Sequence, residues 1–184
     1  MKKNEYILIA GLILLGVASR TVLHLGTNVE FVTAIGISAG YFLNSNKLSM
    51  LTVFIIMLIS DLIIGNSNIF LFTWSAFLIA PLLSNVLRRY LDRFSDLSYF
   101  NRMLYIQAAG IVFTLFFYLW TNLGVVLIAN YYPHTVAGIL ESYINGLPFM
   151  RPQLYSNLLI VPALFVAIDL YFSYYKHQLK VNKA

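Results

Sequence analysis

The chain contains no cysteine and few charged residues, and both shortages narrow the classes of protein to which it can belong. Without cysteine it has no disulfide framework and no zinc site of the Cys/His type. Only 10% of its 184 residues are charged, whereas a soluble domain carries about 25%. The phosphate-binding pattern GxxxxGK[ST] is also missing. These absences argue against a water-soluble globule and against a P-loop ATPase.

Most of the chain consists of long apolar segments. Hydrophobic residues make up 60% of the chain, and its mean hydropathy is +0.78. A helix that crosses a bilayer needs about 20 mostly apolar residues. The sequence therefore predicts an all-α integral membrane protein with one domain over residues 1–184. Six transmembrane helices are predicted at about 6–23, 31–43, 48–65, 69–87, 103–123 and 154–175, of which 31–43 is short for a crossing.

Lys and Arg residues lie in short clusters between the apolar segments, and this clustering sets the predicted orientation. With six crossings, ten of the 12 fall on one side, and only Arg20 and Arg151 fall on the other. Basic residues concentrate in the cytoplasmic loops of membrane proteins. The pattern predicts a multi-pass protein of the cell membrane, surrounded by lipid, with both termini in the cytoplasm. It also argues against nucleic acid as a partner, because the basic residues do not form one continuous surface.

Asp61 is the most informative single residue, because it lies inside the nearly continuous apolar run 48–68. A carboxylate at the centre of a membrane helix costs about 2.5–3.5 kcal/mol on insertion scales, so it usually faces other helices or a water-filled cavity. One interpretation is that Asp61 lines a polar pocket near the outer face. The other is that it reaches water at the helix end or ties helices together. In either case we expect a partner, which is Arg20, a ligand group or a bound proton.

Other polar and aromatic residues gather at the same predicted outer ends and loops. The substrate-binding candidates are Asp61, Trp74, Trp120, Asn122, Glu141 and Arg151. Small-molecule sites are commonly built from a few polar groups that converge in an apolar cleft. The two tryptophans also fit an aromatic belt at the membrane interface. The connection 131–153 contains three prolines around a predicted short helix at 136–145, and it is predicted to fold over the outer end as a lid.

The segment Gly36-Ile37-Ser38-Ala39-Gly40 matches the pattern G-x-S-x-G of some serine hydrolases. A serine nucleophile needs a base within hydrogen-bond reach, and the three histidines fall in predicted loops or in the C-terminal tail. The alternative is that Gly36 and Gly40, together with Gly11, allow close packing of helices. We favour packing over an intramembrane serine protease, and we predict no enzymatic activity, no cofactor and no metal site.

Short motifs along most of the chain support a family resemblance. They are GISAGYF at 36–42, SDLIIG at 60–65, WTNLGVV at 120–126 and GILESYINGLPFMR at 138–151. In this order they resemble an uncharacterised family of predicted membrane transport proteins, similar to the substrate-binding S components of energy-coupling-factor (ECF) transporters. The resemblance implies six helices, an outward-facing pocket and a gating loop between the first two helices, which contains Arg20, Asn28 and Glu30. It also implies a separate transmembrane coupling protein and two ATPases.

Two features of the sequence depart from the S-component pattern. The first helix has Ala10 and Ala18 with Leu14 between them, instead of the AxxxA pair that docks the coupling protein. Lys2 occupies the position where cobalt and nickel S components carry a metal-binding histidine, which argues against these metals as substrates. The sequence as a whole predicts capture of a small water-soluble nutrient, such as a vitamin or cofactor precursor. The alternative is a structural or assembly membrane protein that binds no ligand.

Overall fold

The structure is a computed structural model that describes residues 3–23, 26, 28–29, 31–94 and 96–181. Within these residues the secondary structure is helical, with no strand, so the predicted all-α fold is confirmed. Glu30, one of the predicted gating residues, lies outside the described residues. The described helices are α1 Lys3–Thr21, α2 Val32–Phe42, α3 Asn46–Ile64, α4 Phe70–Leu91, α5 Tyr99–Leu127 and α6 Val136–Val181.

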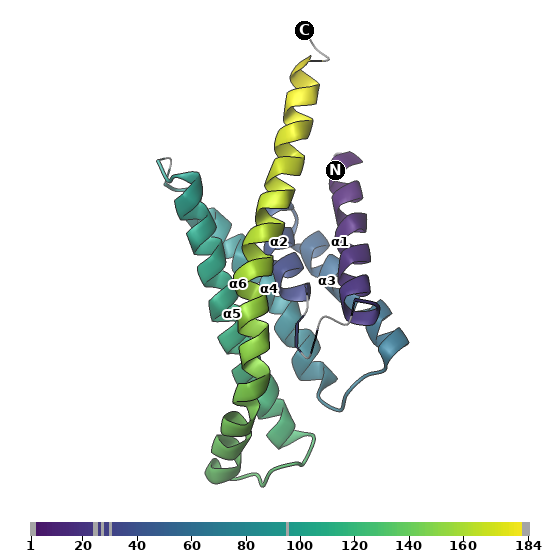
Figure 1. Cartoon of the computed structure of the whole chain (residues 1–184), viewed down its shortest axis with the longest axis vertical. Helices are drawn as coiled ribbons and strands as arrows, with labels where there is room; N and C mark the ends of the chain where they lie inside the picture. Colours follow the sequence, from purple (N-terminus) through teal and green to yellow (C-terminus); the bar gives the residue numbers. More distant parts are fainter. Residues whose placement is uncertain (1–2, 24–25, 27, 30, 95, 182–184) are drawn as a thin grey trace.

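Consecutive helices run in opposite directions, so the loops fall at two ends of the bundle. Figure 1 shows the start of α1 and the end of α6 on the same side of the molecule, and the α5–α6 connection at the opposite end. The hydroxyl of Tyr171, late in α6, donates to the backbone oxygen of Asn4 at 3.1 Å. We call the end that holds both termini the terminal end, and the other the loop end. The α1–α2, α3–α4 and α5–α6 connections lie at the loop end.

Four of the described helices, α3, α4, α5 and α6, are long and apolar enough to cross a membrane. Many large apolar side chains point outward, with exposures of 72% for Leu14, 78% for Leu62 and 74% for Leu159. Exposed apolar surface on this scale is unfavourable in water and favourable against lipid tails. The chain is therefore a helical membrane protein.

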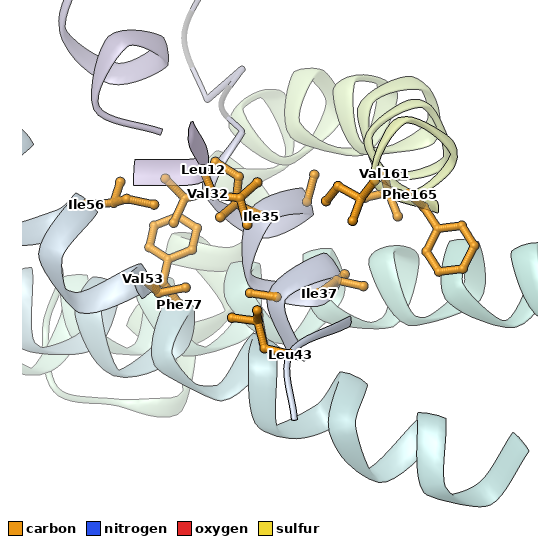
Figure 2. Packing of buried hydrophobic residues seen from close by; sticks show 14 of the residues in the cluster. Leu12, Val32, Ile35, Ile37, Leu43, Val53, Ile56, Phe77, Val161 and Phe165 are labelled. Atoms are coloured by element: carbon orange, nitrogen blue, oxygen red, sulfur yellow. The ribbon is translucent and has the colours of Figure 1, made fainter. Parts of the chain in front are cut away.

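Helix α2 lies at the centre of the bundle and packs against each of the other five helices. Every residue from Val32 to Gly40 is buried, because this helix is apolar on all sides. Figure 2 shows Val32, Ile35 and Ile37 of α2 among side chains of the surrounding helices, such as Phe77. With 11 residues, α2 is roughly 16 Å long, which is about half the hydrocarbon thickness of a bilayer.

Because α2 ends inside the protein, its last carbonyl groups need hydrogen-bond donors that water does not supply. Side chains of α3 and α4 provide them. Ser49 Oγ donates to Ala39 O at 2.9 Å, and Asn85 Nδ2 donates to Gly40 O at 3.3 Å. Arg88 Nη1 donates to Tyr41 O at 2.9 Å and to Leu43 O at 3.2 Å. The guanidinium also places positive charge at the negative end of the α2 dipole.

The glycines of the G-x-S-x-G segment mark the closest approach between α2 and α4. A Cβ atom on Gly40 would lie 2.1 Å from the backbone oxygen of Pro81, and one on Gly36 would lie 3.0 Å from Ala80 Cβ. These two positions therefore serve the packing of helices, as the sequence suggested. Gly11 does not, because a Cβ atom there would meet nothing within 4 Å. The close approach of another helix predicted at Gly11 is therefore not found among the described residues of the chain.

Helix α6 differs from the sequence-based expectation of a short helix followed by a separate span. It runs without a break from Val136 to Val181 and includes Pro148, Pro152 and Pro162. A proline removes one backbone donor, but membrane helices tolerate this where neighbouring groups bond the freed backbone. Near the first two prolines, the Tyr118 hydroxyl donates to Tyr143 O, and Asn28 Nδ2 donates to Phe149 O at 2.9 Å. Most of the expected lid is thus the first part of α6.

Candidate functional site at the loop end

Asp61 lies in the last turn of α3, at the loop end of the bundle. The helix begins after Ser45, whose side chain accepts a hydrogen bond from Leu48 N at 3.4 Å. It ends at Gly65, which has a φ of 83° and donates its backbone N–H to Asp61 O. Glycine adopts this left-handed conformation at little cost. The cap therefore stops the helix four residues after the carboxylate.

Both oxygens of the Asp61 carboxylate have partners from other helices. Arg20 Nη2, in the last turn of α1, lies 2.7 Å from Oδ1. Trp74 Nε1, near the start of α4, donates to Oδ2 at 2.7 Å. The side chains are largely buried, with exposures of 7% for Asp61 and 16% for Arg20. Arg20 also donates through Nη1 to Met57 Sδ.

This cluster supports the second interpretation of Asp61, because the carboxylate ties α1, α3 and α4 together. Arg20 is the partner of Asp61, and it was one of the three partners expected from the sequence. Phe54 and Phe70 pack edge-on against the Trp74 ring, at centroid distances of 5.6 and 6.1 Å. They help to hold the indole in position for its hydrogen bond. A ligand that binds the Asp61 carboxylate would first have to displace these partners.

Trp120 and Asn122 are close in sequence but face different neighbours. Trp120, on α5, donates through Nε1 to Ser75 Oγ of α4 at 2.9 Å and stacks on Phe116. Asn122 faces α6, where Ser142 Oγ donates to its backbone oxygen at 3.2 Å. A Cβ atom on Gly146 of α6 would lie 2.4 Å from Asn122 Oδ1, so a larger residue there would have to displace the Asn122 side chain.

A small cleft lies between α5 and α6 beside Asn122, with a volume of about 30 Å³. On α5 it is lined by Phe117, Tyr118, Thr121 and Asn122, and on α6 by Gly146, Phe149, Met150 and Gln153. Such a volume holds roughly one or two water molecules, whereas pockets for drug-sized ligands measure about 300–1,000 Å³. The cleft in this structure is therefore too small for a ligand of that size.

The α1–α2 connection closes this cleft from the loop end. Asn28 is one of the lining residues, and its side chain donates to the backbone oxygen of Phe149 on α6. Its φ of 60° is in the left-handed region, which asparagine tolerates better than most residues. The connection follows α1, whose last turn contains Arg20, the residue that pairs with Asp61. An ion pair thus holds the helix before the connection, and Asn28 within the connection is hydrogen-bonded to α6.

Glu141 and Arg151, the two charged residues predicted to close the site, are exposed on α6. Neither has an ion-pair partner among the described residues, and neither lines the cleft. The structure therefore divides the six predicted residues. Asp61 and Trp74 share one cluster, Trp120 contacts α4, Asn122 lines the α5–α6 cleft, and the two charged residues lie outside.

Of two further buried polar residues on α6, Gln153 was not singled out from the sequence. Gln153 is 2% exposed and lines the cleft. Asn157, one helical turn further, donates to Thr114 Oγ1 of α5 at 2.9 Å in the protein interior. A glutamine beside Pro152 in a predicted loop gives no sequence indication that it is buried. If the predicted helix 154–175 had been extended to include residue 153, Gln153 and Asn157 would have been placed on one helix face. Among the described residues, no cluster of His, Asp or Glu is arranged to hold a metal ion.

Comparisons with known proteins identify a family and nothing more specific. A family model with the description "Family of unknown function (DUF6580)" matches residues 1–180. The chain belongs to this family. The searches of curated proteins and of solved structures gave no match.

Proposed function

We propose that this member of the DUF6580 family captures a small water-soluble molecule in the cleft between α5 and α6, and that the α1–α2 connection is its gate. The observation that carries the proposal is the contact of Asn28 with the Phe149 carbonyl, because it spans a polar and aromatic cleft. The cleft would admit a ligand when this contact opens and the cleft widens. The Arg20–Asp61 pair supports the gate by fixing the end of α1.

The proposed topology has six crossings, with the terminal end in the cytoplasm and the cleft facing outward in the cell membrane. The ten-to-two division of Lys and Arg residues supports this orientation. Helix α2 is too short to cross alone, but it is enclosed by the other helices, and irregular backbone at membrane depth is tolerated where protein covers it. We propose that uptake of a nutrient such as a vitamin precursor depends on a separate coupling protein with ATPases.

A structural or assembly role is the second candidate function. The observation in its favour is that both Asp61 oxygens are bonded within the protein, as a packing contact requires. The G-x-S-x-G segment favours packing as well, since Gly36 and Gly40 face α4 and Ser38 is fully buried. Under this alternative the cleft holds only water.

The two functions are separated by what the purified protein carries. The protein is extracted gently from its membrane, and small molecules released from it are identified by native and small-molecule mass spectrometry. Capture predicts one bound compound in stoichiometric amount, and the absence of any such compound from protein expressed in rich medium would favour the structural role.

The gate is tested by Asn28→Asp, which tolerates the same backbone conformation but lacks the Nδ2 donor. Loss of one hydrogen bond of about 1 kcal/mol should speed ligand release by about fivefold. Asn68→Asp, at an exposed position of the α3–α4 connection, is the matched control and should leave release unchanged. Equal release rates in the wild type and in Asn28→Asp would contradict the gate.

A further inference from the structure

Gln153 has an unusual environment for a glutamine in a membrane protein. The residue is 2% exposed, and it lines the α5–α6 cleft. Its backbone oxygen accepts from Ser156 Oγ, but its side-chain amide makes no hydrogen bond to any described residue. Neither atom of this amide is among the fully enclosed side-chain atoms that lack a partner, so the amide reaches the space of the cleft. Such a group can bond a molecule that enters the cleft.

The remaining polar groups of the cleft are also uncharged. Asn122 Oδ1 accepts only a long contact of 3.5 Å from Ser142, so it keeps most of its acceptor capacity. Thr121 donates its hydroxyl hydrogen to Phe117 O and has free acceptor capacity. Among the described residues that line the cleft, none is Asp, Glu, Lys, Arg or His. Against these residues a charged ligand would lose its hydration without gaining a counter-charge.

The apolar part of the cleft is largely aromatic. Phe117 and Tyr118 of α5 and Phe149 of α6 form its walls. Aromatic side chains favour flat rings through offset or edge-on contacts. The amide of Gln153 presents a donor and an acceptor side by side, which matches the edge of an amide, lactam or imide.

We infer that Gln153 recognises the ligand, and that this ligand is an uncharged planar compound with an adjacent donor and acceptor. This inference rests on the proposed function and names the substrate class of the same cleft. The hydrogen bonds run from Gln153 Nε2 to a ligand carbonyl and from a ligand N–H to Gln153 Oε1. Without a ligand, water satisfies the amide. A planar ring enters when Asn28 releases Phe149 and the cleft widens.

The test uses pairs of probes that share a ring and differ in charge, namely benzamide with benzoate and uracil with orotate. Binding to the purified protein is measured by calorimetry and by the shift in melting temperature. We expect at least one neutral probe to bind, and its charged counterpart to bind at least tenfold more weakly. If neither neutral probe binds, or if the charged members bind equally well, the inference is wrong.

Variants of Gln153 test whether this residue is responsible for binding the neutral probes. Gln153→Leu should weaken binding of the neutral probe at least tenfold. Its melting temperature without ligand should change little, because the amide makes no hydrogen bond to a described residue that the leucine would lose. Gln107→Leu is the control, since Gln107 lies on α5 outside the cleft, where its Nε2 contacts Asn157 O. It should retain the affinity of the wild type.

Failure of this inference is distinguishable from failure of the proposed function. If a compound copurifies with the protein but its affinity is the same in Gln153→Leu, the capture function stands and the role of Gln153 is refuted. If no compound copurifies and no probe binds, both are refuted. A copurified anion would also refute the assignment of an uncharged ligand while leaving capture intact.

Discussion

The carboxylate of Asp61 and the guanidinium of Arg20 stabilise the fold only as a pair. Each side chain is largely buried, so water can replace a lost partner only in part. Removing one member of a buried ion pair leaves an uncompensated charge, which is far more costly than removing both. The sequence identified Asp61 as a residue that needs a partner or a ligand. In the structure, this carboxylate connects three helices.

We predict that Asp61→Asn lowers the free energy of unfolding by about 3 kcal/mol, the low end of the range for a buried ion pair. The measurement is thermal or denaturant unfolding in detergent. Asp92→Asn is the matched control, because Asp92 pairs with Arg102 at 3.1 Å but is 58% exposed. Exposed pairs contribute about 0–1 kcal/mol.

A double variant checks the pairing itself. If Arg20 and Asp61 act together, adding Arg20→Met to Asp61→Asn should recover part of the lost stability, because no isolated charge remains. Strict additivity of the two single changes would mean that the pair does not exist in the folded protein.

Arg88 has a different role from the arginine that follows it, although both belong to the basic cluster that sets the predicted orientation. It bonds two carbonyl groups at the buried end of α2, while Arg89 is exposed. Arg88→Leu should lower stability by at least about 1–3 kcal/mol, the cost of one buried carbonyl without a donor. Arg89→Leu should change stability by no more than about 0.5 kcal/mol. Equal melting temperatures for these two variants would contradict the capping role.

At the scale of elements, the crossing of α2 and α4 leaves no room for a side chain at Gly40. We predict that Gly40→Ala destabilises the protein by at least about 1–3 kcal/mol, the usual cost of overpacking, because its Cβ atom would overlap the Pro81 carbonyl. Gly11→Ala is the control, since its Cβ atom would meet no neighbour. It should raise stability by up to about 1 kcal/mol through helix propensity.

Folded yield and melting temperature in detergent measure both glycine variants. If Gly40→Ala is as stable as Gly11→Ala, α2 and α4 do not pack as closely as in this structure.

At the scale of the whole molecule, the predicted orientation gives a direct test. The chain contains no cysteine, so single cysteines can be introduced without background labelling. Asn68→Cys is exposed at the loop end and should react with an impermeant thiol reagent in intact cells. Arg93→Cys is exposed in the α4–α5 connection, at the terminal end, and should react only after the cells are opened. Labelling of Arg93→Cys from outside would contradict the six-crossing proposal.

Much of the fold could be predicted from hydropathy alone. The predicted segments 48–65 and 69–87 agree with α3 and α4 to within a few residues, because a run of about 20 apolar residues has few stable alternatives to a helix. The continuity of α6 could not be predicted, since three prolines usually end a helix in water. The structure nevertheless continues α6 as one helix through all three.

The site was less predictable than the fold. Hydropathy and loop charge placed Asp61, Trp74, Trp120 and Asn122 at one end of the bundle, but they could not tell which helix face each occupies.

The sequence by itself determined that the chain is a bundle of apolar helices, because burial of backbone polar groups in a membrane permits little else. Its basic clusters supply the orientation we propose, since loop charge is read without tertiary structure. Only the tertiary structure decided which partner satisfies each buried polar group. It joined Asp61 to Arg20, placed Arg88 at the end of α2, and left the Gln153 amide facing a cleft. Hydrogen bonds and ion pairs act over about 3 Å, so only helix packing brings such residues, up to 167 positions apart in sequence, into contact.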